Sequence, residues 1–135
     1  MLNATVSDTT TRGIRVRTTS QFLEERSNPS ERQFLFGYRI HIQNTGDRQV
    51  QLLARHWIII DADGNRQDVS GEGVVGEKPQ IAPDDSYDYS SFCPLATPWG
   101  TMEGSYRMRD STGEEFEVEI ARFCLVAKDH VVAEA

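Results

Sequence analysis

Residues 34–43 read Phe34-Leu35-Phe36-Gly37-Tyr38-Arg39-Ile40-His41-Ile42-Gln43, with a large apolar side chain at every even position. Alternation with a period of two is typical of a β-strand that is buried on one face. The turn sequence Asn44-Thr45-Gly46-Asp47 follows, and residues 48–60 again carry apolar side chains at even positions. We therefore predict a β-hairpin over residues 33–60, in which a turn of odd length places Ile42 opposite Val50.

The rest of the chain continues in short alternating segments. Residues 12–18, the segment around Tyr87 and Tyr89, residues 101–109 and residues 115–127 all favour strands, and turn sequences separate them. The apolar phase of the last segment changes at Ala121 and Arg122, which predicts a β-bulge there. About seven strands without a long helical pattern predict an all-β fold, an immunoglobulin- or fibronectin type III-like β-sandwich. A barrel is the alternative architecture.

The length and composition fit a single domain. We expect residues 1–11 to be a flexible N-terminal extension, residues 12–128 to be the β-sandwich domain, and residues 129–135 to be a C-terminal tail.

Charge and hydropathy restrict the function classes. The formal net charge of -7 argues against nucleic-acid binding, because a phosphate backbone requires a basic surface. No run of about 18 apolar residues exists, so we predict no membrane-spanning segment. The first residues do not resemble a secretory signal, and the two cysteines, Cys93 and Cys124, form no disulfide framework. We therefore predict reduced thiols and a cytoplasmic location.

Candidate catalytic groups are scattered. His41, His56 and His130 have no spacing typical of a metal or catalytic site. In the predicted hairpin, His56 lies opposite Phe36 on the apolar face, which indicates a buried core histidine. The sequence thus predicts no metal site, no cofactor and no enzymatic activity.

A glycine-rich stretch, Gly71-Glu72-Gly73-Val74-Val75-Gly76, matches the GxGxxG pattern of dinucleotide-binding loops. That pattern indicates a nucleotide only where it opens a helix, and here Glu77-Lys78-Pro79 follows. We favour a structural role, in which the glycines permit positive φ, a bulge or close strand packing. The alternative is an anion-binding loop formed by Gly71, Gly73, Gly76 and Lys78.

Several segments together closely resemble the bacterial ApaG family over roughly residues 12–128. They are the stretch from Leu53 to Gly64, the glycine-rich stretch with Glu77-Lys78-Pro79, Tyr89-Ser90-Ser91, the stretch from Thr97 to Tyr106, and the stretch from Ile120 to Leu125. The resemblance implies a fibronectin type III-like β-sandwich and a role in protein–protein interaction. It also implies an association with cobalt and magnesium resistance or efflux, and a GxGxxG motif that has been read as a pyrophosphate site. It supplies no catalytic residue.

Two functional hypotheses result. The first is a non-enzymatic interaction domain that binds an unidentified protein through two loops, with Val74, Val75, Leu95 and Trp99 as contact residues. The second is binding or sensing of pyrophosphate or a nucleotide, such as diadenosine tetraphosphate, through the glycine loop.

Overall fold

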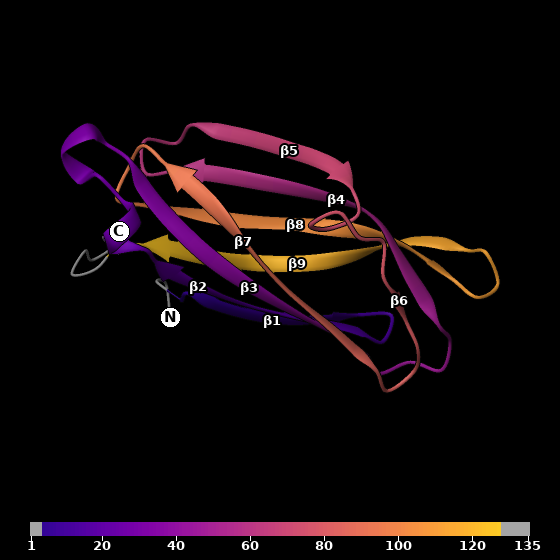
Figure 1. The fold of residues 1–135 in the computed structure, drawn as a ribbon. Helices are drawn as coiled ribbons and strands as arrows, with labels where there is room; N and C mark the ends of the chain where they lie inside the picture. Colours follow the sequence, from indigo (N-terminus) through magenta and orange to yellow (C-terminus); the bar gives the residue numbers. More distant parts are fainter. Residues whose placement is uncertain (1–3, 128–135) are drawn as a thin grey trace.

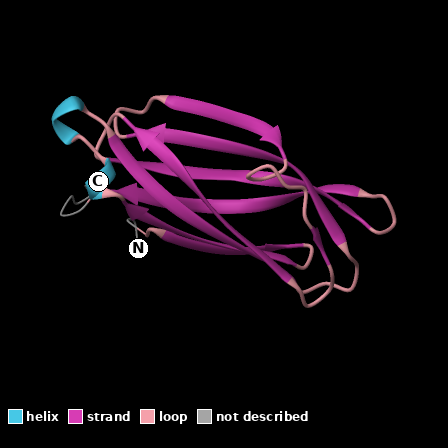
Figure 2. Ribbon diagram, viewed as in Figure 1, coloured by secondary structure: helices cyan, strands magenta, loops and turns pink. Residues whose placement is uncertain are grey.

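The computed structural model describes residues 4–127, which form two antiparallel β-sheets (Figure 1). The first sheet has the strand order β1-β2-β3-β7, and the second has the order β5-β4-β8-β9, with the short strand β6 also paired to β4. The strands of the first sheet are β1 (Val6–Thr11), β2 (Ile14–Phe22), β3 (Phe34–Asn44) and β7 (Ser86–Leu95). Those of the second sheet are β4 (Val50–Asp61), β5 (Arg66–Glu72), β6 (Gln80–Ile81), β8 (Trp99–Asp110) and β9 (Glu115–Val126). The described helical segments are two 3-10 turns between β2 and β3, η1 (Glu24–Arg26) and η2 (Pro29–Glu31), drawn in cyan in Figure 2.

The predicted all-β sandwich is confirmed. The two sheets pack face to face, and the apolar side chains of both inner faces form one core. Phe36 and Ile40 of β3 are fully buried in it, as are Tyr106 of β8 and Phe123 of β9. Burial of alternate residues explains the period of two, because successive side chains of a strand point to opposite faces.

The predicted hairpin between residues 33–43 and 48–60 is wrong, because β3 and β4 lie in different sheets. Ile42 pairs with Val16 of β2 and Tyr87 of β7, whereas Val50 pairs with Asp110 of β8. The connection after Asn44 crosses from one sheet to the other. Alternation predicts which face of a strand is buried, and both inner faces of a sandwich produce the same pattern, so the pattern does not identify the partner strand.

Asn44 anchors this crossing. Its side chain is fully buried, and its Nδ2 donates to the carbonyl of Arg48 at 2.7 Å and to that of Ile81 at 3.0 Å. Its Oδ1 accepts from the amide of Gly46 at 2.9 Å. One buried amide therefore ties the first sheet, the crossing loop and strand β6 of the second sheet together.

Two β-bulges set the orientation of surface residues. The predicted bulge at Ala121 and Arg122 is confirmed, since the register between β8 and β9 shifts at this point. A second shift, between Leu52 and Ala54, was not predicted. It turns Trp57 into the core and His56 outward. The expectation that His56 is a buried core residue is therefore wrong.

The N-terminal expectation also needs correction. Val6–Thr11 of the expected flexible extension form strand β1, which pairs along its whole length with β2. Strand β1 also lies against β9: Ser7 Oγ donates to the carbonyl of Ala121 at 2.8 Å, and the amide of Glu119 donates to Thr11 Oγ1 at 3.1 Å. Strand β1 buries little apolar surface, and its hydroxyl side chains suit it because they hydrogen-bond to the neighbouring sheet. The expected tail, residues 129–135, lies outside the described residues.

Candidate functional site

The glycine stretch begins in a strand and ends in a tight turn. Gly71 lies within β5, opposite Arg55, and the amide of Gly73 donates to the carbonyl of Leu53 at 2.9 Å. The amides of Val74 and Glu77 donate to each other's carbonyls at 2.8 and 2.9 Å, around a turn in which Val75 has φ 42° and Gly76 has φ 83°. Two successive positive φ values define a type I′ turn, the usual two-residue hairpin connection.

Close contacts explain two of the three glycines, with a backbone carbonyl at Gly73 and a side chain at Gly71. At Gly73, where φ is 64°, an added Cβ would lie 2.3 Å from the carbonyl oxygen of Glu77. At Gly71, an added Cβ would lie 2.7 Å from Nη2 of Arg55. At Gly76 nothing lies within 4 Å of an added Cβ, so close packing does not require a glycine there. Gly76 instead occupies the second positive-φ position of the turn, a backbone conformation that favours glycine.

The cationic groups beside the loop already have partners. Arg55 Nη1 donates to the carbonyls of Glu72 at 3.1 Å and Gly73 at 3.0 Å. Lys78 Nζ lies 2.7 Å from Glu72 Oε1, and this hydrogen bond lowers the pKa of the Glu72 carboxyl. In this structure both side chains therefore bond to groups of the protein itself.

The four predicted partner-contact residues do not form one surface. Val74 and Leu95 are buried, Trp99 is half-buried, and Val75 is 55% exposed at the tip of its turn. The two loops also lie at different places along the sandwich. The glycine loop bonds to Leu53 near the start of β4, whereas Thr97 Oγ1 accepts from the amide of Ala62, just beyond the end of β4 (Figure 1). The shared apolar patch expected from these residues is thus absent from the described part of the chain.

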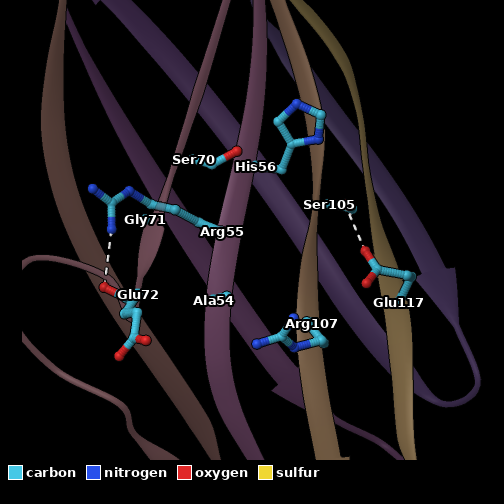
Figure 3. Close-up of a pocket in the computed structure, with 9 residues that line it drawn as sticks. All are labelled: Ala54, Arg55, His56, Ser70, Gly71, Glu72, Ser105, Arg107 and Glu117. Atoms are coloured by element: carbon cyan, nitrogen blue, oxygen red, sulfur yellow. Dashed lines mark hydrogen bonds between the residues drawn. The ribbon is translucent and has the colours of Figure 1, made fainter.

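A shallow hollow of about 370 Å³ lies on the outer face of the second sheet (Figure 3). Its lining mixes charges of both signs on β5, β4, β8 and β9. It comprises Ala54, Arg55, His56, Ser70, Gly71, Glu72, Ser105, Arg107 and Glu117. Ser105 Oγ donates to Glu117 Oε1 at 2.8 Å, and Arg107 Nε lies 3.5 Å from Glu115. The lining holds two arginines and two glutamates, so the hollow presents no excess of one sign.

His56 belongs to a surface ion-pair cluster at one side of this hollow. Its Nε2 lies 2.9 Å from Asp68 Oδ2, and Arg66 Nε lies 2.7 Å from Asp68 Oδ1. The hydrogen bond from Arg66, followed by that from His56, holds the pKa of Asp68 well below its usual range. The carboxylate is thus a fixed acceptor, which suits a structural role better than proton transfer.

The outer face of the first sheet carries the clearest exposed anchor. Phe92 of β7 is 54% exposed, and the guanidinium carbon of Arg26 lies 4.7 Å from its ring centroid. A hollow of about 280 Å³ beside the ring includes Gly37, on which Leu23 packs, and Ser90. The sequence carried a signal for this site, because Phe92 falls on the polar face of a strand whose tyrosines occupy the odd positions.

Residues 4–127 hold no group of three or more histidine, cysteine, aspartate or glutamate side chains that could bind a metal ion. They also contain no helix with the length and apolar character needed to cross a membrane.

The sequence of this β-sandwich is similar to those of known proteins. The family model described as the ApaG domain matches residues 24–110. Protein ApaG of Methylobacterium sp. (strain 4-46) is 50% identical over 115 residues, which cover 85% of this chain and 88% of that protein. Protein ApaG of Anaeromyxobacter dehalogenans is 46% identical over 121 residues, which cover 90% of this chain and 95% of that protein. The chain belongs to the ApaG family, which confirms the resemblance seen in the sequence.

Solved structures agree with this fold. A crystal structure from Bordetella pertussis, described there as an ApaA protein, matches with a TM-score of 0.83 at 40% identity, covering 95% of this chain and 99% of that one. An X-ray structure of a structural-genomics target designated SoR45 matches with a TM-score of 0.84, also at 40% identity, covering 91% of this chain and 93% of that one.

Proposed function

We propose that this ApaG-family chain is a non-enzymatic binding module whose contact surface is the outer face of the first sheet around Phe92. The observation that carries the proposal is the exposure of an aromatic ring stacked by an arginine on a sheet face. Buried aromatic and arginine side chains dominate the binding energy of protein interfaces, and an exposed pair of this kind is available for a partner.

The charges around Phe92 suggest the chemistry of the partner. Three arginines, Arg15, Arg17 and Arg39, lie on this outer face, together with two carboxylates: Asp8, which is opposite Arg17, and Asp88, which is 4.0 Å from Arg39. The sheet face therefore has a small cationic excess in a chain whose net charge is -7. A partner segment with carboxylates flanking one apolar side chain would be complementary to it. A cytoplasmic location is part of the proposal, and it agrees with Cys93 and Cys124 being reduced thiols.

The test is affinity capture with matched variants, each checked for an unchanged far-UV spectrum. Phe92→Ala should lose a partner that the unaltered chain retains. Val75→Ala, which truncates an equally exposed apolar side chain on the glycine loop, should retain it. Retention by Phe92→Ala and loss by Val75→Ala would move the contact surface to the glycine loop and overturn this assignment.

Pyrophosphate or nucleotide binding through Gly71, Gly73, Gly76 and Lys78 is the alternative proposal. Lys78 supports it by placing an ammonium group near the loop, but its pairing with Glu72 and the bonded amides of the loop argue against it. Calorimetry with pyrophosphate and diadenosine tetraphosphate tests it. Heat that disappears in Lys78→Ala supports the alternative, and no heat at millimolar ligand rules it out. A link to cobalt or magnesium resistance would then operate indirectly, through a protein partner or a nucleotide pool.

A further inference from the structure

The free edge of strand β7 is the least protected of the four sheet edges. Strands at sheet edges present unpaired amides and carbonyls, and proteins usually protect them by charged side chains, proline, bulges or a covering segment. Strands β1 and β9 cover one another, since the amide of Cys124 donates to the carbonyl of Ala4 at 2.8 Å. At β5, the guanidinium of Arg55 binds the carbonyl of Glu72, the last residue of the strand, and the strand also carries the charged side chains of Arg66 and Asp68.

Strand β7 lacks these devices over most of its length. It pairs with β3 without a register shift from Ser86 to Leu95, and among the described residues it has no second strand neighbour. Between Ser86 and Phe92 it contains no proline, no cation and one charged side chain, Asp88. Pro94 lies only at its far end.

The hydrogen-bond pattern shows which groups face the open edge. The amide of Asn44 donates to the carbonyl of Asp85 at 3.0 Å, just before β7 begins. Opposed residues of an antiparallel pair alternate between bonded and non-bonded, so the odd residues of β7 bond to β3. The amides and carbonyls of the even residues therefore point away from β3. Those residues are Ser86, Asp88, Ser90 and Phe92, and all four are exposed.

We propose that β7 pairs antiparallel with β7 of a second copy of this chain, around a two-fold axis at Ser90. The two first sheets then form one continuous sheet. An isologous contact of this kind is the commonest way in which soluble proteins assemble.

The side chains favour this register. Pairing about Ser90 places two small hydroxyl side chains at the axis and sets Asp88 of each copy opposite Phe92 of the other. The Asp88 carboxylate of one copy then lies beside the Phe92 ring of the other, on which Arg26 stacks. The two-fold axis repeats this contact, so an Asp88 carboxylate and an Arg26 guanidinium come close at two places in the dimer. Pairing about Asp88 would instead bring two carboxylates face to face, which is destabilising.

Mass measurement over a range of concentrations tests the association. In light scattering at about 150 mM salt, where the Debye length of about 8 Å limits repulsion between the acidic chains, the mass should rise from 15.3 kDa toward twice that value between about 1 and about 500 µM. A constant mass of one chain over this range would overturn the proposal, and would leave the proposed partner surface untouched.

Variants at the axis test the edge itself. Ser90→Pro removes an amide that bonds to the second copy and not to β3, so the dissociation constant should rise at least about tenfold while Ser90→Ala keeps it within about twofold. Ser90→Lys keeps the amide but sets two ammonium groups opposite each other, so it should raise the dissociation constant as Ser90→Pro does. It tests the same contact without a proline, in case the proline variant misfolds. A dimer unchanged in both would contradict the proposal.

Cysteine cross-linking tests the register. In a pair centred on Ser90, the two Cα atoms of a Ser90→Cys variant lie about 5.5 Å apart, within the range of about 4.4–6.8 Å for a disulfide. Two Asp88→Cys side chains would be separated by four residues along the strand, about 13 Å. Mild oxidation should therefore link Ser90→Cys and leave Asp88→Cys as single chains, and the reverse result would overturn the register. The native thiols, Cys93 and Cys124, are buried and serve as an internal background.

Discussion

The guanidinium of Arg55 occupies the space that a side chain on Gly71 would need. An added Cβ at Gly71 would lie 2.7 Å from Nη2 and 2.8 Å from Cζ of Arg55. The same guanidinium holds the carbonyls of Glu72 and Gly73. The first glycine of the motif thus permits an arginine to fasten the end of β5 to the turn that follows.

Gly71→Ala should displace Arg55 and break these two hydrogen bonds. The long arginine side chain can move aside, so we expect a loss of about 1–2 kcal/mol in the free energy of unfolding. Urea denaturation measures it, and Ser70→Ala, on the outer face of the same strand, is the control with a change below about 0.5 kcal/mol. Equal stability of the two variants would show that the contact with Arg55 contributes nothing.

The second and third glycines should differ in their sensitivity to alanine. Gly73→Ala forces a Cβ to within 2.3 Å of a backbone carbonyl, which cannot move without opening the turn. We expect it to cost about 3 kcal/mol or more, whereas Gly76→Ala pays only for its positive φ, about 1 kcal/mol. The same urea experiment ranks them. If Gly76→Ala were the more damaging, Gly76 would have a contact that this structure does not contain.

Asn44→Ala should be among the more destabilising polar substitutions in the chain. It removes three hydrogen bonds of a fully buried side chain and leaves the carbonyl of Ile81 without that partner, so we expect a loss of about 2–4 kcal/mol. Asn65→Ala, which removes an exposed amide bonded to Asp61, is the matched control. Thermal unfolding of both variants provides the comparison, and similar melting temperatures would refute the anchoring role.

Stability should fall at alkaline pH because tyrosines are buried between the sheets. Burial raises the pKa of Tyr89 and of Tyr106, whose hydroxyls lie 2.5 Å apart, and raises that of Tyr38. A phenol with a raised pKa in the folded state contributes its full stability below its unfolded pKa of about 10 and loses it as the pH rises further. The free energy of unfolding should therefore decrease by up to about 1.4 kcal/mol per pH unit for each phenol above that pH.

Urea midpoints at about pH 8 and about pH 11, together with tyrosinate absorbance, test this expectation. Ionisation of the buried phenols should coincide with unfolding. Tyrosinate formation by these residues in a chain that stays folded would contradict it.

The thiol of Cys93 should be inert in the folded chain. Burial raises its pKa to about 12, so almost no thiolate forms at neutral pH. A thiol-specific disulfide reagent at about pH 8 should label Cys93 only at the rate of unfolding, and immediately in denaturant. Cys93→Ser, which retains Cys124, identifies which thiol reacts, and rapid labelling of Cys93 in the folded state would show that the strand opens locally.

The fold class could be predicted from the sequence because burial of alternate residues leaves a visible pattern. Phe36 and Ile40 follow it along β3, and the bulge near Ala121 interrupts it where the structure does. Pairing could not be predicted in the same way. Asn44-Thr45-Gly46-Asp47 has the composition of a hairpin turn, and only the buried contacts of Asn44 show that it joins two sheets.

The orientation of β4 illustrates a second limit. After the bulge, Trp57 and Ile59 face the core while Ile58 and Ile60 occupy the other face, so apolar side chains on both faces left no change of phase to detect. His56 was consequently assigned to the core. The sequence predicts partner contacts in two loops, at residues such as Val74 and Leu95, whereas the contact residue that we propose, Phe92, lies within strand β7.

The contact between β1 and β9 has a consequence for synthesis on the ribosome. Ser7 bonds to Ala121 and Thr11 to Glu119, more than 100 residues later in the chain, so β1 leaves the exit tunnel well before this neighbour and contacts it only after β9 has emerged. Until then the outer edge of β1 is unpaired in the nascent chain. Ribosome-stalled chains that end before β9 should accordingly remain sensitive to protease, and acquire resistance in a single late step once that strand has emerged.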